Sequence, residues 1–263
     1  MRGLPAASTF WHNSLYMFFS QYRPEWVLTV RRAASPVKSC HRQNQVHILT
    51  LLCMSLLCPV AAQVQQSAVP TVTFTCDFPG SEPDHYVVSV SDDGNAKYDS
   101  DSRLNNSAAS EPFHADFAVS QDARTRVFDL TKRANYFQSD LDSKKKNLAS
   151  TGVKTLTYKD AQKSTRGTYN YSPIPAVQAL TAFFQSLATT LEFGHRLDYY
   201  LHYQKLALDE ELKKMEEMSK SGGLEEISAI APILQKIADD PAVIKVVRAR
   251  AQGLLQAPAT KGK

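Results

Sequence analysis

The sequence predicts an α+β fold: an antiparallel sheet of about five strands with a crossover helix and a covering long helix, followed by a C-terminal helical region. Two patterns predict it. Short segments of alternating apolar residues indicate strands up to residue 171, and apolar residues recur at three- and four-residue steps after residue 175. A helical segment separates two groups of strands, which is typical of α+β rather than of alternating α/β proteins.

The first strand signals are a single strand followed by a hairpin. Val72, Phe74 and Cys76 alternate with threonines, as in a strand with one buried face. Farther on, Asp93 and Gly94 form a pair that accepts positive φ angles, so the flanking segments are predicted to pair. A polar loop is expected over residues 99–110. The segments with strand character cover residues 71–76, 86–90, 96–98, 113–119, 154–159 and 166–171.

The crossover helix lies between the two groups of strands. Ser120 or Asp122 can cap its free amide groups, and Val127 and Leu130 fall on one helical face. The helix is expected to end by residues 136–137. It would therefore pack one apolar side on the sheet.

A much longer helical signal begins at Pro175 and continues to Ser219. At ~1.5 Å per residue, a single helix of this length is too long for a small domain. We therefore expect a break near residues 206–209, with Asp209 capping a second segment, and an end at Gly222.

Two shorter helices are expected over residues 224–238 and 241–255. Asp240 is the expected cap of the second, with Pro241 in its first turn, where a missing N–H costs little. The predicted organisation is an over-extended N-terminus with a signal peptide over residues 1–62, a flexible leader over 63–70, the α+β domain over 71–204, a helical extension over 205–257 and a tail over 258–263.

Residues 38–62 have the pattern of a secretory signal peptide. Lys38 and Arg42 give a positive flank, and the apolar run that follows is about a dozen residues, short of the ~20 that span a bilayer. Small residues at the minus-three and minus-one positions predict cleavage between Ala62 and Gln63. The sequence therefore predicts a secreted or periplasmic protein without a stable membrane span after cleavage.

The charge of the exported part argues against nucleic-acid binding. The whole chain has 30 basic and 26 acidic residues, but six of the basic residues and one of the acidic residues precede residue 63. The remainder carries 24 basic and 25 acidic residues, a net charge of −1. A protein without a positive field has no general means of attracting phosphates.

Cysteine usage excludes an internal disulfide in the exported part. Three of the four cysteines precede residue 63, which leaves Cys76 alone. A single cysteine is expected to be buried as a small apolar residue or to be available for intermolecular pairing.

The turn at residues 93–95, the segment at 125–130 that leads to 135–137, and the strand start at 151–156 resemble a family of small βββαββα domains of unknown function in bacterial exported proteins. The resemblance covers residues 71–192 and rests on architectural positions. It implies an exported α+β domain and brings no assigned activity or active site. The helices after Glu192 are an addition to that layout.

The set of residues that most resembles a metal-binding site lies on the long helix. Glu192, His195, Asp198 and His202 follow one another at three- and four-residue steps, and a Glu-x-x-His pair is used in helical metal sites. The candidate metal ligands are Glu192, His195 and His202. The alternative is an ordinary surface pair of Asp198 and His202, because no second such motif occurs to complete a two-metal site.

Other chemical patterns are weaker. Aspartates around the first hairpin could offer calcium ligands but lack the EF-hand spacing, and a solvated hairpin tip is the alternative. Cys76 with His85 or His114 could form a thiol nucleophile, although burial of the thiol explains the same residues. Neither a nucleophile elbow nor a phosphate-binding loop occurs, and no cofactor is expected.

Three functions remain open from the sequence. The first is a non-enzymatic binding or structural module of the cell envelope or secretome, with a protein partner on the C-terminal helices. The second is a metal-dependent enzyme that uses Glu192, His195 and His202. The third is an inhibitor or chaperone-like domain that captures another exported protein. The oligomeric state and any ligand are not predicted.

Overall fold

The computed structural model describes residues 68–101 and 112–256, and these residues form the predicted α+β fold. The elements with their bounds are β1 (Thr71–Asp77), β2 (His85–Ser91), β3 (Asn95–Ser100), β4 (Phe113–Ala118), α2 (Gln121–Arg133), β5 (Val153–Lys159), β6 (Ser164–Tyr169), α3 (Pro175–Tyr203), α4 (Leu208–Lys220), α5 (Ala231–Asp239) and α6 (Lys245–Gln256). Short 3-10 helices are η1 (Asn135–Phe137), η2 (Lys205–Ala207) and η3 (Ile227–Ile230). The predicted signal peptide with Ala62 and Gln63, most of the leader, the loop after residue 101 and the tail lie outside the described residues.

The sheet has six strands in the order β4-β3-β2-β1-β5-β6, and every neighbouring pair is antiparallel. All six segments with strand character form strands, in line with the expected sheet of about five. The first hairpin forms as predicted, and Gly94 adopts a φ of 90° in its turn. The strand β3 extends to Ser100, so two residues assigned to the polar loop belong to the sheet.

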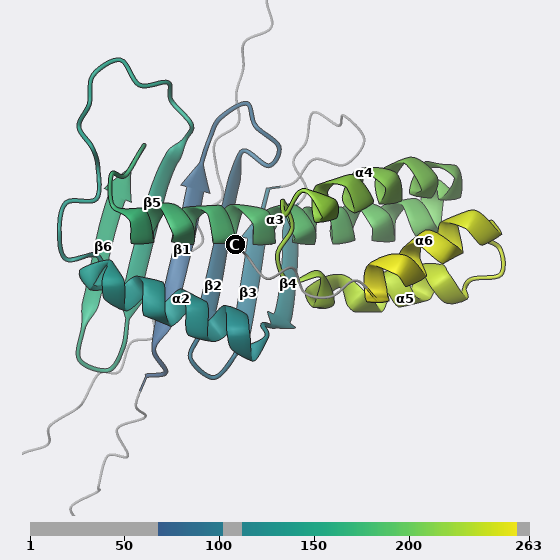
Figure 1. The fold of residues 1–263 in the computed structure, drawn as a ribbon, viewed down its shortest axis with the longest axis horizontal. Helices are drawn as coiled ribbons and strands as arrows, with labels where there is room; N and C mark the ends of the chain where they lie inside the picture. Colours follow the sequence, from purple (N-terminus) through teal and green to yellow (C-terminus); the bar gives the residue numbers. More distant parts are fainter. Residues whose placement is uncertain (1–67, 102–111, 257–263) are drawn as a thin grey trace, which may run out of the picture. The chain divides into compact units, whose positions relative to one another are not determined.

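The sheet and helices form two layers, with α2 and α3 lying across the same face of the sheet (Figure 1). Side chains alternate along each strand, so one set faces these helices. Val72, Phe74 and Val88 in this set are fully buried. The other set is mostly polar, and no described helix covers it.

Helix α2 begins where the sequence predicted and ends within the predicted limit. Ser120 is its N-cap, and its hydroxyl accepts a hydrogen bond of 3.2 Å from the amide of Ala123. The helix ends at Arg133, before the predicted limit of residues 136–137. Asn135, Tyr136 and Phe137 all have φ angles of 50° to 61°, a left-handed backbone that cannot continue a right-handed helix.

The break after α3 lies slightly before the expected position. Gln204 leaves helical geometry, with φ of −146° and ψ of 59°, and η2 connects it to α4. Asp209 is not the cap of α4, because Ala207 occupies that position and makes no side-chain cap. The carboxylate of Asp209 instead accepts from Lys213 at 2.7 Å and from Arg250 at 3.0 Å. It therefore ties α4 to α6.

The last helix begins later than predicted. Residues 241–244 form a turn, in which the Asp240 carboxylate accepts a hydrogen bond of 2.8 Å from the amide of Ala242. The helix α6 starts only at Lys245, so Pro241 is outside it. The helix expected over residues 224–238 is in fact η3 followed by α5.

The helical extension closes a four-helix arrangement on the second half of α3. Helix α3 lies against α4 and α5, and α6 lies against the same two helices. The neighbouring helices cover the apolar face of α4. Its core contains the buried residues Leu197, Leu201, Leu208, Leu212, Met215, Leu234, Ile237, Val247 and Ala251.

The connection between α4 and α5 contacts the N-terminus of α2 and so holds the helical extension against the rest of the domain. Both carboxylate oxygens of Glu226 accept hydrogen bonds of 2.7 Å from Ser120, one from its amide and one from its hydroxyl. This places a negative charge at the N-terminus of α2, where the helix dipole favours it. A Cβ atom on Gly194 would lie 2.5 Å from Cγ2 of Ile230, so glycine allows η3 to approach α3 closely.

Candidate functional site

The middle of α3 carries a buried carboxylate against the sheet. Glu192 is 5% exposed, and its Oε1 accepts hydrogen bonds of 2.7 Å from the hydroxyls of Tyr98 and Ser100. Burial, followed by the charge of Glu192, raises the pKa of Tyr98. Tyr98 therefore stays protonated at neutral pH and acts as a donor to the carboxylate. The sequence pattern placed Ser100 in a polar loop, so this contact was not predicted.

His195 lies next to this carboxylate. Its Nδ1 is 3.9 Å from Oε2 of Glu192, which is too long for a hydrogen bond. Within the described part of the chain this buried nitrogen has no hydrogen-bond partner. The imidazole instead stacks on Phe113, with ring centroids 3.9 Å apart and an interplanar angle of 4°. The contact between His195 and Phe113 therefore packs α3 against the edge strand β4.

The predicted metal site does not assemble. His202 lies ten residues beyond Glu192 on the same helix, which is about 15 Å along its axis. Its Nδ1 lies 2.7 Å from the carbonyl oxygen of Asp198, at the exposed end of α3. Among the residues that the structure describes, no group of three or more His, Cys, Asp or Glu side chains could hold a metal ion. Glu192 and His202 are therefore too far apart on one helix to bind the same ion.

Cys76 is buried, as one of the two alternatives predicted. It belongs to a row of paired residues that crosses the sheet. Burial raises the pKa of its thiol. A thiol of this kind is a poor nucleophile at neutral pH. His85 and His114 are exposed on the polar face of the sheet, so they cannot activate it. The row consists of Phe113, Ser100, Tyr86, Cys76, Lys154 and Tyr169.

Lys154 is the unexpected member of this row. It is only 4% exposed, and its ammonium group donates to the carbonyl oxygens of Thr151, Gly152 and Asn170 at 2.8 to 3.2 Å and to the hydroxyl of Thr151 at 2.8 Å. Burial lowers its pKa. The oxygen cage explains how a lysine is accommodated in the core layer and fixes the start of β5 to the end of β6.

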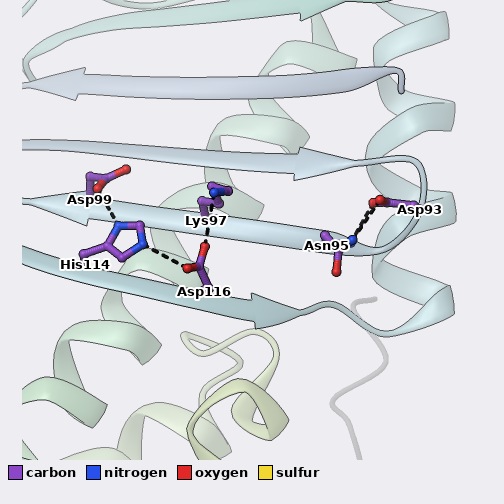
Figure 2. A network of polar contacts seen from close by, with 6 residues as sticks. All are labelled: Asp93, Asn95, Lys97, Asp99, His114 and Asp116. Carbon is purple, nitrogen blue, oxygen red and sulfur yellow. Dashed lines mark hydrogen bonds and ion pairs between the residues drawn. The ribbon is translucent and has the colours of Figure 1, made fainter. Parts of the chain in front are cut away.

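The polar face of the sheet carries a second network (Figure 2). Nδ1 of His114 lies 2.7 Å from Oδ1 of Asp99 on the neighbouring strand, and Nε2 lies 3.1 Å from Oδ2 of Asp116. Lys97 lies 3.5 Å from the other oxygen of Asp116. Because a carboxylate on each strand binds one of its ring nitrogens, His114 cross-links β3 and β4.

The aspartates considered for calcium do not converge. Asp93 binds the amide and side chain of Asn95 in the turn, as Figure 2 shows. Asp99 binds His114, and Asp101 accepts from the amide of His85 at 2.8 Å. These contacts match the alternative of a solvated hairpin with local hydrogen bonds.

The network around His114 should make this histidine titrate above its ordinary value. Hydrogen bonds that the ring donates to the carboxylates of Asp99 and then Asp116 raise its pKa. Because the folded value is raised, its contribution to stability is complete below the unfolded-state pKa of about 6.5 and is lost as pH rises through the folded value. An NMR titration should show the His114 midpoint falling in the double variant Asp99→Asn and Asp116→Asn. Equal midpoints in the native, variant and urea-unfolded proteins would contradict the network.

Several exposed apolar residues lie at the connections between helices of the extension. Nine large apolar residues are exposed in the described ranges, and four of them flank the α3–α4 and α5–α6 connections. Figure 1 shows both connections at the end of the extension away from the sheet. A contact of 2.6 Å between Lys205 and Asp240 joins them. We call this surface the apolar tip: Tyr203, 74% exposed, Leu206, 92%, Ile244, 59%, and Val246, 50%.

Comparison with known proteins adds no assignment. No family model matches the chain, and no significant match occurs among curated proteins. The resemblance to exported βββαββα domains stays a prediction, and four strands precede α2 here, one more than in that layout. None of the described helices is long and apolar enough to cross a membrane.

Proposed function

We propose that the chain is an exported, non-enzymatic binding module of the cell envelope or secretome, and that it binds through the apolar tip. The observation that carries this proposal is the exposure of Leu206 and its three neighbours at the end of a well-packed helical bundle. Burying such side chains removes apolar surface from water, so each favours association. Exposed apolar surface of this kind commonly marks interaction sites.

The polar clusters support a binding role rather than catalysis. The carboxylate of Glu192 receives two hydroxyl donors, both nitrogens of His114 face carboxylates, and Lys154 is surrounded by oxygens. Each arrangement connects two structural elements. The metal-dependent alternative loses support because Glu192 and His202 lie far apart on α3. Capture of another exported protein remains one form that binding at the tip could take.

Site-specific photo-crosslinking tests the proposal. A photoreactive amino acid at position 206 in the full chain, produced in its own cells, should form adducts with envelope or secreted components. The matched control is position 148, because Leu148 is also an exposed apolar residue, at 43%, but lies in the loop before β5. Absence of adducts at position 206, or equal adducts at both positions, would contradict binding through the tip.

A further inference from the structure

The oxygen cage around Lys154 consists of four neutral atoms. The ammonium group donates to the carbonyl oxygens of Thr151, Gly152 and Asn170 and to the hydroxyl of Thr151, at 2.8 to 3.2 Å. These are ordinary N–H···O distances. In the described part of the chain, no carboxylate oxygen is among the hydrogen-bond partners of this group. The cage therefore binds a positive charge through oxygen dipoles alone.

Contacts that do not involve Lys154 hold the cage in shape. Oδ1 of Asn170 accepts hydrogen bonds from the amide of Thr151 at 3.0 Å and from its hydroxyl at 3.4 Å. Because this hydroxyl gives its proton to Asn170, its lone pairs are directed to the cation. The amide of Asn170 donates at 3.0 Å to Oδ1 of Asp142, and Gly152 has a φ of 88° that favours glycine. The chain itself thus positions the oxygens.

The chemistry of the cage restricts its ligand. Divalent cations in proteins are normally bound with the help of carboxylates, whereas carbonyl oxygens alone replace the hydration shell of ions with a single charge. A primary ammonium group has three N–H donors to share among the four oxygens. Lys154 is only 4% exposed, and its strand neighbours Cys76 and Tyr169 are also buried, so its methylene groups are enclosed as well. The site fits an unbranched alkylammonium ion.

We propose that the oxygen cage is a binding site for a primary ammonium group. In the native protein Lys154 fills it as a tethered ligand, and a free alkylammonium ion binds there when this side chain is shortened. Tethering gives the ammonium group a high effective concentration, so the native fold needs no cation from solution to join the start of β5 to the end of β6. The site belongs to the sheet and is independent of binding at the apolar tip.

Chemical rescue of Lys154→Ala in the full chain tests the inference. Alanine keeps the Cβ atom, and n-propylammonium supplies the rest of the lysine side chain. At about four times its dissociation constant, n-propylammonium should raise the folding equilibrium constant of this variant about fivefold. Tetramethylammonium at the same ionic strength has the same charge but no N–H donor and should not do so. Urea unfolding followed by circular dichroism measures both effects.

Two further variants connect the rescue to the cage. Adding Thr151→Val to Lys154→Ala removes one cage oxygen at similar volume and should reduce the rescue. Lys159→Ala removes an exposed lysine from the same strand, so neither this variant nor the native protein should respond to n-propylammonium. Equal effects of the two salts on Lys154→Ala, or an equal response of Lys159→Ala, would overturn the inference.

A variant that is unfolded in buffer still gives a decision. In that case circular dichroism is followed while each salt is added to Lys154→Ala without urea. Folding induced by n-propylammonium and not by tetramethylammonium supports the site, because only the first ion can donate hydrogen bonds to the cage. Failure to fold with either salt would mean that the cage does not bind a free ammonium group.

Discussion

Replacing Lys154 with methionine should lower the free energy of unfolding by about 3 kcal/mol. The change keeps most of the side-chain volume and removes the donor that three carbonyl oxygens and one hydroxyl share. A buried acceptor left without a donor costs about 1 to 3 kcal/mol. Release from the cost of burying the ammonium group offsets part of this loss. Urea unfolding followed by circular dichroism measures the difference.

The matched control is Lys159→Met, the same substitution on the same strand. Lys159 is exposed at the other end of β5, so its replacement should change stability by less than about 0.5 kcal/mol. Equal losses in the two variants would mean that the effect comes from the altered charge. An unchanged stability of Lys154→Met would mean that the oxygen cage contributes nothing to the fold.

Lys154 also shows what the sequence could and could not predict. The alternation of Lys154, Leu156 and Tyr158 places all three on the buried face, and the strand itself was expected. From residue type alone, however, a lysine is expected to be exposed to solvent. Its acceptors come from the loop before β5 and from the end of β6, and only the fold brings these backbone oxygens together.

The candidate site on α3 failed as a prediction for a related reason. Helical spacing correctly placed Glu192 and His195 side by side, because residues three apart share a face. It also suggested His202 as a third ligand, although ten residues of helix separate the ends of the stripe. The actual partners of Glu192 are Tyr98 and Ser100, almost one hundred residues earlier, and local periodicity contains no information about such contacts.

Helix ends were predictable where a side chain determines them. Ser120 is an N-cap by its own chemistry, and the structure confirms it. Asp209 and Pro241 have equally suitable chemistry but do not begin helices, because Asp209 pairs with α6 and residues 241–244 form the turn that reverses the chain. Tertiary contacts decided both positions. The apolar tip depends on the same two reversals and so could not be located from the sequence.

Replacing Phe184 with alanine should lower the free energy of unfolding by about 4 kcal/mol. Phe184 is fully buried on α3 and stacks on Phe74 of β1, with ring centroids 5.4 Å apart and an interplanar angle of 3°. Truncation removes this contact and leaves a cavity between the helix and the sheet. The control is Tyr203→Ala on the same helix, which should change stability by less than about 0.5 kcal/mol because Tyr203 is largely exposed.

The Phe184 variant also tests whether the sheet and the extension unfold together. Helix α3 contributes Leu187 to the buried layer above the sheet and Leu201 to the helical bundle without an interruption between them. Weakening one end should therefore lower the stability of the other, and hydrogen exchange should show protection lost in both regions to a similar extent. Loss of protection confined to the sheet would mean that the extension is an independent unit, which the contacts of Glu226 with Ser120 argue against.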